Sequence, residues 1–378
     1  SAYLNRTPSS AGNRKTWTYS FWIKVNGSTG YQYYFSANYG GSSQSWLQMD
    51  NSISKLTFIG YTGGYDWNLS SSVEFRDPSA WYHIVISFDT TQATASNRVK
   101  WYVNGEQLTL DRYSQYPALN HESTFNTTTS HKLSDPSYGF NGYLADVHFI
   151  DGQALAPTDF GEFDDNNVWQ PKEFSGSYLS GTQYGLSISN STLNYDPAPI
   201  LDGSTSTQYV DRPTNNSTIN ITNLPAASTS LRIYCYKESG TITTNSGLVV
   251  AAGSSSWITP TSITYPFTLT SISCTGGNGG DGWGVSAIEI DGSIITQGSG
   301  ANSFYLNFSD NSSNAALGTD SSGNSNTWTV NNLSVASGAD NDSLIDTPTN
   351  YEAGSGNNGG NYATLNPLNT GSNLTLSD

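Results

Sequence analysis

The four histidines are the residues of this chain best suited to acid–base or metal chemistry, and their spacing supports neither. They are His83, His121, His131 and His148, with no H-x-x-x-H or H-E-x-x-H pair among them and no cysteine at zinc-ligand spacing. His83 and His148 fall in strand-like runs, where a histidine is more often a hydrogen-bonded sheet residue than a ligand. No G-x-S-x-G elbow and no Walker-type loop occurs. These absences argue against nucleophilic hydrolysis and nucleotide use.

Aromatic side chains beside short polar residues offer a different chemistry, the stacking of sugar rings. The C–H face of a sugar packs on an aromatic ring while its hydroxyls need donors and acceptors. Two Gly-rich loops have this composition: GYTGGYDWN, with Tyr61, Tyr65 and Trp67, and NGGDGW, with Asp281 and Trp283. We expect these five residues to contact a glycan. The alternative is that the rings fill sandwich edges or a subunit contact, because a chain with 10 Trp and 24 Tyr must use many of them structurally.

Composition limits both the fold and the partners. The chain has 378 residues, enough for two or three domains, and a net charge of -16 that would repel a phosphate backbone. Nucleic acid is therefore not an expected partner. Charged residues make up only 12% and aromatic residues 13%, which together with abundant Gly, Ser, Thr and Asn predicts an all-β fold. Cys235 and Cys274 lie in strand-like runs, and we expect buried free thiols there.

The apolar runs and the first residues of the sequence indicate whether the chain enters a membrane and whether it is part of a longer protein. No apolar run approaches the roughly 18 residues of a membrane span, and no basic-then-apolar signal segment opens the sequence. We therefore expect no membrane insertion. The sequence starts inside a strand pattern at Ala2–Leu4, so we expect the chain to be a piece of a longer protein.

Short strands must position any binding residues in the first half of the chain. The run WTYSFWIKV places Trp17, Tyr19, Phe21, Ile23 and Val25 on one face, with the period of a half-buried strand. Further strands are predicted at 31–36, 46–49, 55–60, 81–88, 98–103 and 106–110. The last two flank Asn104-Gly105, a strong hairpin signal. FNGYLADVHFIDG, from Phe140 to Gly152, alternates like a closing strand followed by a turn.

The order of these strands resembles the laminin-G-like, concanavalin-A-like lectin/glucanase sandwich. More narrowly, RTPSSAGNRKTW, FNGYLADVHFIDGQAL and YLNFSDNSSNAALGTDSSGNSNTWTVNNLSV resemble proteins of marine bacteriophages that carry such a domain on tail fibres or other virion appendages. In that group a segment like VWQPKEFSGSY runs almost directly into one like NSFYLNFSDNS. In this chain about 120 residues separate the two segments. We take them as an inserted domain.

Three parts of the chain follow from this comparison. Residues 1–175 are predicted to form a laminin-G-like jelly-roll sandwich and residues 179–298 an inserted β-sandwich. Residues 299–378 are predicted to form an extended β segment that packs on its neighbours, and in the related phage proteins a similar segment leads into a further domain. The insert opens with PILDGSTSTQY and closes with SAIEIDG, which resemble the ends of discoidin-like, galactose-binding-like jelly rolls. Tyr209 stands where tryptophan is usual in that family.

The resemblance also implies what a site would contain. Concanavalin-like glucanases carry E-x-D-x-x-E, and Glu289-Ile290-Asp291 lacks the second glutamate and lies in the insert, so we expect no catalytic residues. Galactose-binding-like domains commonly hold a structural calcium ion between the D-G-x-x-x-T loop and the last-strand glutamate. Carried across, this implies Asp202, Thr207 and Glu289 as calcium ligands. The alternative is that Asp202-Gly203 is an ordinary turn and Glu289 a solvated strand residue.

These observations favour a non-enzymatic bacteriophage virion surface protein, a tail fibre, adhesin or capsid appendage that binds host-surface carbohydrate. Other virion proteins and copies of the same chain are the expected partners. A homo-oligomer is expected because symmetric closure is the default for such assemblies, and a trimer is one candidate because fibres are commonly threefold. Two alternatives stay open. The sandwiches are purely architectural, or the chain is a glycoside hydrolase with unrecognised carboxylates.

Overall fold

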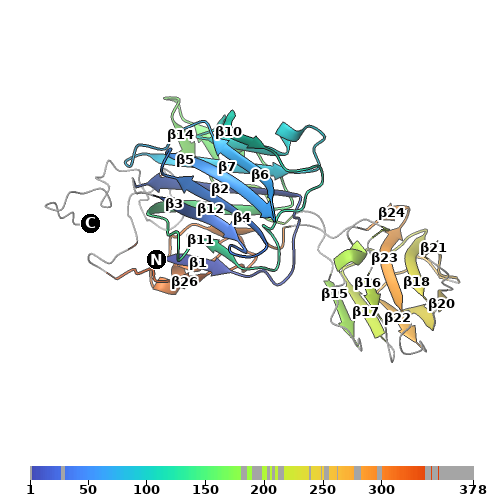
Figure 1. The fold of residues 1–378 in the computed structure, drawn as a ribbon. Helices are drawn as coiled ribbons and strands as arrows, with labels where there is room; N and C mark the ends of the chain where they lie inside the picture. Colours follow the sequence, from blue (N-terminus) through green and yellow to red (C-terminus); the bar gives the residue numbers. More distant parts are fainter. Residues whose placement is uncertain are drawn as a thin grey trace. The chain divides into compact units, whose positions relative to one another are not determined.

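The computed structural model describes residues 2–26, 30–179, 185–189, 198–201, 205–206, 209–211, 217–237, 240–247, 249–250, 255–261, 263–275, 282–295, 300–336, 342 and 348. The chain divides into two compact units (Figure 1): unit 1, residues 1–180 with 299–378, and unit 2, residues 181–298. Throughout the described residues the regular structure is strand, interrupted by the short 3-10 segments η1 (Ala95–Asn97), η2 (Pro157–Asp159), η3 (Ala198–Leu201) and η4 (Asn314–Gly318). The predicted all-β class is confirmed. No helix in this part of the chain is long and apolar enough for a membrane span.

Unit 1 contains two large antiparallel sheets among its described residues. The eight-stranded sheet has the order β10 (Leu110–Gln115), β6 (Tyr65–Ser71), β5 (Lys55–Thr62), β4 (Ser43–Asp50), β3 (Tyr31–Ala37), β11 (His131–Leu133), β1 (Tyr3–Arg6), β26 (Thr329–Asn331). The six-stranded sheet has the order β25 (Phe304–Leu306), β12 (Gly142–Asp151), β2 (Thr16–Val25), β7 (Trp81–Asp89), β8 (Val99–Val103), β9 (Glu106–Gln107). A hairpin of β13 (Gly161–Phe163) and β14 (Trp169–Pro171) accompanies them.

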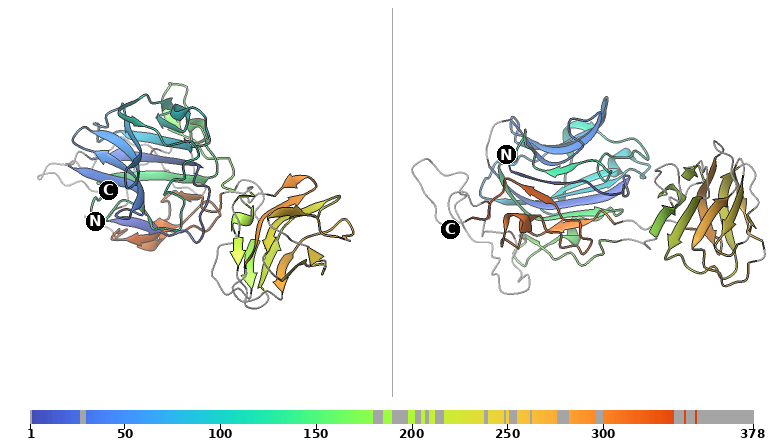
Figure 2. Two further views of the ribbon diagram at one scale, coloured as in Figure 1. Left: turned by 45° about the vertical axis from the view of Figure 1, so that its right-hand side comes forward. Right: turned by 90° about the horizontal axis from the view of Figure 1, so that it is seen from below.

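The two large sheets of unit 1 lie one over the other (Figure 2). The core between them is dominated by aromatic rings. The predicted inner face of β2 is confirmed, since its five alternating apolar residues from Trp17 to Val25 all belong to this core. The opposite face of β2 is buried as well, because Trp22 packs with Ala145 and Trp169. The hairpin β13–β14 supplies Trp169, so the six-stranded sheet is covered locally on both faces.

The predicted hairpin turn is confirmed, and the alternation predicted for the closing strand is wrong. Asn104 and Gly105 both have positive φ, 48° and 84°, as a type I′ hairpin requires, and they join β8 to β9 as predicted. The closing strand β12 does pair with β2, but its simple alternation is wrong. A bulge between Ala145 and His148, with Asp146 at φ 46°, reverses the faces, so Val147 enters the core while Ala145 packs on the other side.

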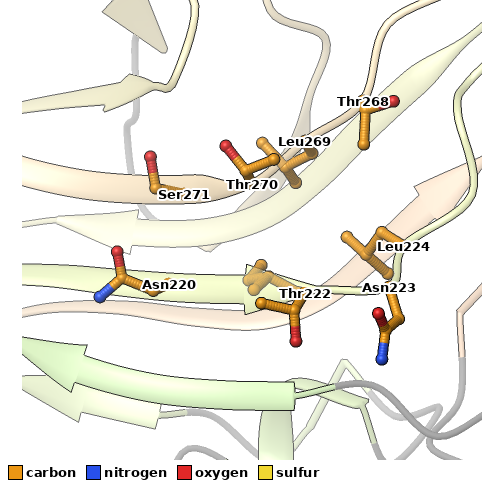
Figure 3. Close-up of a pocket in the computed structure, with 9 residues that line it drawn as sticks. Asn220, Thr222, Asn223, Leu224, Thr268, Leu269, Thr270 and Ser271 are labelled. Carbon is orange, nitrogen blue, oxygen red and sulfur yellow. The ribbon is translucent and has the colours of Figure 1, made fainter.

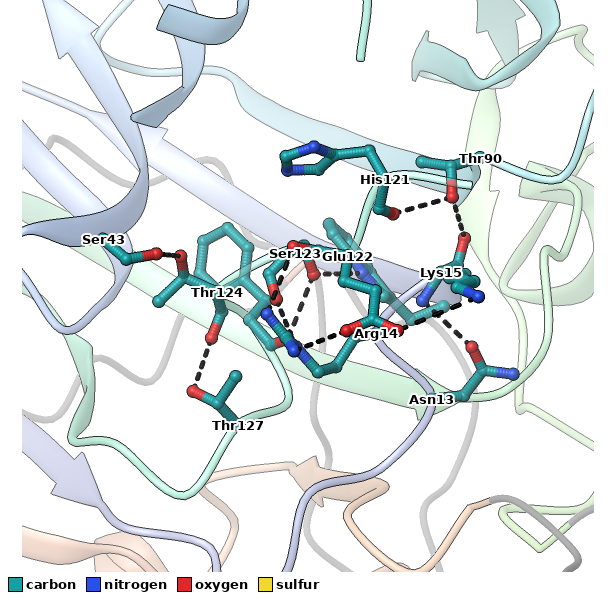
Figure 4. Close-up of polar contacts among 12 residues, drawn as sticks. Asn13, Arg14, Lys15, Ser43, Thr90, His121, Glu122, Ser123, Thr124 and Thr127 are labelled. Carbon is teal, nitrogen blue, oxygen red and sulfur yellow. Dashed lines mark hydrogen bonds and ion pairs between the residues drawn. The ribbon is translucent and has the colours of Figure 1, made fainter. Parts of the chain in front are cut away.

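Hydrogen bonds anchor the segment between β10 and β11 to the end of the sandwich (Figure 4). Arg14 donates from Nε to the Ser123 carbonyl at 2.8 Å and from Nη1 to Glu122 at 2.7 Å. Thr90 Oγ1 donates to the His121 carbonyl at 2.8 Å. These bonds hold a segment without regular structure against the strand ends.

The chain after unit 2 returns into both sheets of unit 1. Phe304 pairs with Phe149 of β12, and β26 pairs with β1. The buried carboxylate of Asp151 lies at this junction, where it accepts hydrogen bonds from the amides of Asn13 at 2.8 Å and Gly300 at 3.0 Å. Residues far apart in sequence therefore meet at one buried acid.

Unit 2 has two further antiparallel sheets. One has the order β15 (Gly185–Ser189), β17 (Ser217–Thr222), β22 (Ser271–Thr275), β19 (Thr241–Thr244), β20 (Val249–Val250), and the other the order β16 (Tyr209–Asp211), β23 (Trp283–Ile290), β18 (Leu231–Lys237), β21 (Ser256–Ile258), with β24 (Ser293–Ile294) paired to β23. The core between them is mainly Ile, Leu and Val. Cys235 and Cys274 are buried in this core and form no disulfide with each other, as predicted.

Candidate functional site

Two of the predicted glycan contacts are core residues, and their assignment as stacking platforms is wrong. Trp67 is fully buried against Phe58 and Phe88, because its cross-strand partner Gly60 has no side chain and leaves room for the indole. Trp283 is buried in the core of unit 2, where its Nε1 donates to Ser217 Oγ at 2.9 Å. Asp281, predicted to act beside it, lies outside the described residues.

The other two predicted contacts lie together at the surface. Tyr61 and Tyr65 are cross-strand neighbours at the β5–β6 turn, with ring centroids 5.8 Å apart in an edge-to-face arrangement. Tyr65 is 54% exposed. Alternation along β5 points Phe58 into the core and Tyr61 away from it, and an extra residue in β6 brings Tyr65 opposite Tyr61.

The same outer face carries a second aromatic group on the neighbouring strands. Trp46 of β4 is opposite Ile59 of β5, and Gln44 is opposite Tyr61, so Trp46 and Tyr61 share a face. Leu47 and Met49 of β4 alternate into the core. We call the aromatic residues of this face the aromatic band; its members are Tyr33, Tyr39, Trp46, Tyr61, Tyr65 and Tyr138.

Ring contacts hold the β3–β4 end of the aromatic band in place. Tyr33 stacks on Tyr138 with centroids 4.8 Å apart and lies parallel to Trp46 at 6.2 Å, while Tyr39 meets Tyr33 edge-on at 4.7 Å. Tyr33 is buried beneath its neighbours, whereas Tyr138 is 37% exposed. The band crosses strands β3 to β6, which Figure 1 shows side by side, so it spans about 14 Å at the usual strand spacing. An oligosaccharide could contact several of these rings at once.

Neutral hydrogen-bonding groups accompany the rings. Trp46 Nε1 donates to Gln48 Oε1 at 2.9 Å, which fixes the indole against its strand. Ser36, opposite Trp46, has a buried hydroxyl without a hydrogen-bond partner in the described part of unit 1. The nearby cation Lys132 is paired with the buried Asp135 at 3.1 Å. Burial, followed by a hydrogen bond with Tyr39, raises the pKa of Tyr33, so its phenol stays neutral.

A buried Ser–His pair tests the possibility of hydrolytic chemistry in unit 1. Ser20 Oγ lies 2.9 Å from His83 Nε2, and Trp169 Nε1 donates to His83 Nδ1 at 3.0 Å. Since Nδ1 accepts, Nε2 carries the proton and donates to the serine. This histidine therefore cannot take the Ser20 proton. Burial lowers the pKa of His83 to about 3, which keeps the ring neutral.

The other buried histidines have similar structural partners. His131 Nε2 accepts from the Asn126 amide at 3.0 Å, while its Nδ1 lies 2.8 Å from the Thr129 carbonyl. His148 stacks on Tyr305 with centroids 4.0 Å apart. Burial lowers the pKa of His131 to about 4 and that of His148 to about 3.

Carboxylate pairs of the E-x-D type are present but are engaged in turns and ion pairs. Glu289 is bound by Arg232 through both of its oxygens, with the Nε to Oε1 distance at 2.6 Å. Asp291 accepts from the amides of Ser228 to Ser230, which lower its pKa. A second pair, Glu162 and Asp164, flanks the β13–β14 hairpin, where Asp164 accepts from the Val168 amide at 2.8 Å.

The predicted calcium ligands do not assemble within the described residues. Asp202 and Thr207 lie outside them. Glu289 does not fit a calcium ligand as it stands, because Arg232 occupies both oxygens and balances the charge. In the part of the chain that the structure describes, no three His, Cys, Asp or Glu side chains gather as a metal site would require.

Comparison with known proteins identifies the type of domain in unit 1. Residues 1–159 match the family model of the concanavalin A-like lectin/glucanases superfamily. Unit 1 thus contains a domain of this type, as the strand order predicted. No curated protein sequence matches the chain.

Solved structures resemble the chain only remotely. A heptameric SAP-like pentraxin from Limulus polyphemus is 15% identical over 41% of this chain and 71% of its own, with a TM-score of 0.31. The Ruminococcus gnavus IT-sialidase CBM40, solved with alpha2,3 sialyllactose, is 12% identical over 36% and 84%, with a TM-score of 0.26. Trypanosoma rangeli sialidase is 12% identical over 38% and 22%, with a TM-score of 0.27. Likenesses this remote assign no ligand.

Sequence reasoning found one end of the aromatic band and missed the other. Tyr61 and Tyr65 are marked by the Gly-rich turn between them. Trp46 and Gln48 carry a usable signal too, since they alternate with the apolar Leu47 and Met49. Tyr138 carries none, because it comes from a loop that reaches β3 only in the folded chain.

Proposed function

We propose that this chain is a non-enzymatic glycan-binding protein and that the aromatic band of unit 1 is its binding face. The observation that carries the proposal is the band itself. Rings from four adjacent strands, the β3–β4 turn and one loop share an outward face, with neutral polar groups beside them. Ring faces suit sugar C–H groups, and amide and hydroxyl groups suit sugar hydroxyls. A concanavalin A-like domain is a fitting scaffold for this role.

We propose that the ligand is an uncharged glycan. The chain carries a net charge of -16, which disfavours the approach of sialylated or sulfated sugars. Lys132, a cation on the strand next to the band, is already paired with Asp135. An acidic sugar would need a cation that is not committed elsewhere.

We further propose that the protein works on the surface of a bacteriophage particle, as a tail fibre, adhesin or capsid appendage that contacts host carbohydrate. The support is the resemblance of three long segments to marine bacteriophage proteins, together with the acidic, Asn- and Ser-rich composition of an exposed particle protein. Unit 2 would be a galactose-binding-like module in such an assembly, and copies of the chain and other virion proteins its partners.

The test is binding of the purified chain to an array of neutral, sialylated and sulfated oligosaccharides, with adsorption competition on host cells as the second readout. We expect saturable binding to neutral glycans. No saturable binding on the array would contradict the proposal and favour a purely architectural role. Release of reducing sugar from host polysaccharide, abolished by one Asp or Glu substitution, would instead establish a glycoside hydrolase.

A further inference from the structure

A groove opens in unit 2 where two paired strands separate. β17 and β22 stay in register from Ser217 and Cys274 to Asn220 and Ser271. Beyond a last bond from the Ile221 amide to the Thr270 carbonyl at 2.8 Å, the next contact is the bridge between Ala227 and Phe267. Regular strand structure on the β22 side therefore begins only at Ser271. The groove lies in the gap and has a volume of about 490 Å³ (Figure 3).

The lining of this groove is amphipathic and carries no ionisable side chain. Leu224 and Leu269 are buried and supply apolar surface. Thr222 and Thr270 are exposed, and with Asn220 and Ser271 they supply hydroxyl and amide groups. The volume falls within the range of about 300–1,000 Å³ that ligand sites have. Such a lining matches a ligand with C–H faces and many hydroxyls and offers nothing to a charged one.

The hydroxyls of the groove are available to a ligand, and its wall is held in place. The hydroxyls of Thr222 and Thr270 make no hydrogen bond in the part of unit 2 that the structure describes. Asn245 fixes the segment behind them: its Nδ2 donates to the Thr268 carbonyl at 3.0 Å, and its Oδ1 accepts from the Thr270 amide at 2.9 Å. A wall fixed before binding lowers the entropy lost when a ligand binds.

The groove adjoins the outer face of the sheet that contains β17, and this face is polar because the apolar residues of β17 point into the core. In β17 the residues Ile219 and Ile221 are buried, so the alternate positions Thr218 and Asn220 point outward. Thr218 Oγ1 and Ser273 Oγ meet at 2.9 Å across the strands. A ligand in the groove can therefore extend onto more hydroxyl and amide groups.

We propose that this groove is a second glycan site, which takes a neutral oligosaccharide independently of the aromatic band. The proposal goes beyond the function proposed for unit 1, because it needs no residue of that unit. Without an aromatic ring in its described lining, the groove relies on hydrogen bonds, so its affinity is expected to be lower than that of a ring-stacked sugar.

The experiment uses the full chain with Trp46→Ala, which removes the centre of the aromatic band. Ligand-observed NMR is recorded with neutral oligosaccharides of glucose, galactose and mannose, and with their sialylated or sulfated counterparts. The double change Asn220→Ala with Thr270→Val is then added. Thr243→Val, on the same outward face but outside the groove lining, is the matched control, and Thr270→Ser restores the hydroxyl.

We expect at least one neutral oligosaccharide to bind the Trp46→Ala chain, and the groove double variant to weaken it by about tenfold, as the loss of two hydrogen-bonding groups predicts. Thr243→Val and Thr270→Ser should retain binding. The proposal is overturned if the Trp46→Ala chain binds no neutral oligosaccharide, or if binding is indifferent to the groove variant. Every variant in this experiment carries Trp46→Ala. The results for the groove therefore do not depend on whether the aromatic band binds glycans.

Discussion

The two units solve the same packing problem with different residues. The core of unit 1 is built around large rings such as Trp17, Phe35, Phe58 and Trp101, and it buries three histidines. The core of unit 2 is mostly Ile, Leu and Val, with Trp283 as its buried tryptophan among the described residues. None of the four histidines of the chain lies in residues 181–298.

This difference extends to the outer faces, where the two glycan sites that we propose differ in how they would hold a sugar. Unit 1 carries aromatic rings on the outer face of its eight-stranded sheet, where sugar C–H groups can stack. Unit 2 carries hydroxyl and amide groups on the outer face of the sheet that holds β17, where hydrogen bonding must supply the affinity. The buried histidines add a second contrast, since they make only unit 1 sensitive to mild acid.

Acid unfolding should separate the units by the largest effect. Burial holds the folded-state pKa values of His83, His131 and His148 at about 3 to 4, below the ordinary histidine value of 6.5. As pH falls through 6.5, the unfolded chain binds protons that the folded unit 1 does not, so its free energy of unfolding falls down to about pH 4. Each pKa unit is worth about 1.4 kcal/mol, so three such groups together are of the same order as a typical domain stability of about 5–15 kcal/mol.

Near-UV circular dichroism reports this transition, because only Trp257 and Trp283 of the 10 tryptophans lie in unit 2. We expect most of the near-UV signal to be lost between pH 6.5 and 4, and a second change in the far-UV below pH 4. The raised pKa of the buried Asp151 acts in the opposite direction, since it favours the folded state as pH falls. A single transition of both signals below pH 4 would contradict the contrast between the units.

Trp67→Ala should destabilise unit 1 strongly, because the indole is fully buried over Gly60. The expected loss is about 3–5 kcal/mol in urea unfolding, as for other buried tryptophans. Trp46→Ala removes a partly exposed indole instead and should lower the free energy of unfolding by about 1 kcal/mol. Equal losses of unfolding free energy for the two variants would contradict the assignment of Trp67 to the core and Trp46 to the aromatic band.

Asp151→Asn should lower the free energy of unfolding of unit 1 by about 2–3 kcal/mol, less than Trp67→Ala does. The carboxylate accepts from the amides of Asn13 and Gly300 and from Asn126 Nδ2 at 2.6 Å, and an amide group would turn a donor toward one of these donors. Asp165→Asn, at an exposed position of the β13–β14 turn, is the control and should stay within about 0.5 kcal/mol. Indistinguishable urea midpoints would show that the junction does not depend on this acid.

Calcium removal should have the smallest effect. Because Arg232 holds both oxygens of Glu289, only Asp202 and Thr207 of the predicted set remain to bind the ion, and we expect EDTA to leave the melting temperature of unit 2 almost unchanged. A clear drop with EDTA, reversed by added calcium, would show that these ligands assemble after all, since an ion that binds only the folded state raises its stability.

Local patterns predicted much of the fold and only part of the candidate site. The alternation of Trp17 to Val25 and the Asn104-Gly105 turn are local signals, and both are confirmed. The bulge at Asp146 was not predictable from alternation, because an extra residue in one strand leaves no mark in composition. Trp67 was misassigned because the ring fits over Gly60, a pairing set by register rather than by the loop.

The most direct test of the account is the glycan affinity of Trp46 variants, measured by titration calorimetry with the best neutral ligand from the array. We predict that Trp46→Ala weakens binding by about tenfold, the worth of one stacked ring, and that Trp46→Phe retains most of it. Trp257→Ala, a partly exposed tryptophan of unit 2, is the control and should bind as the unchanged chain does. Unchanged affinity of Trp46→Ala would contradict the assignment of the aromatic band as the binding face.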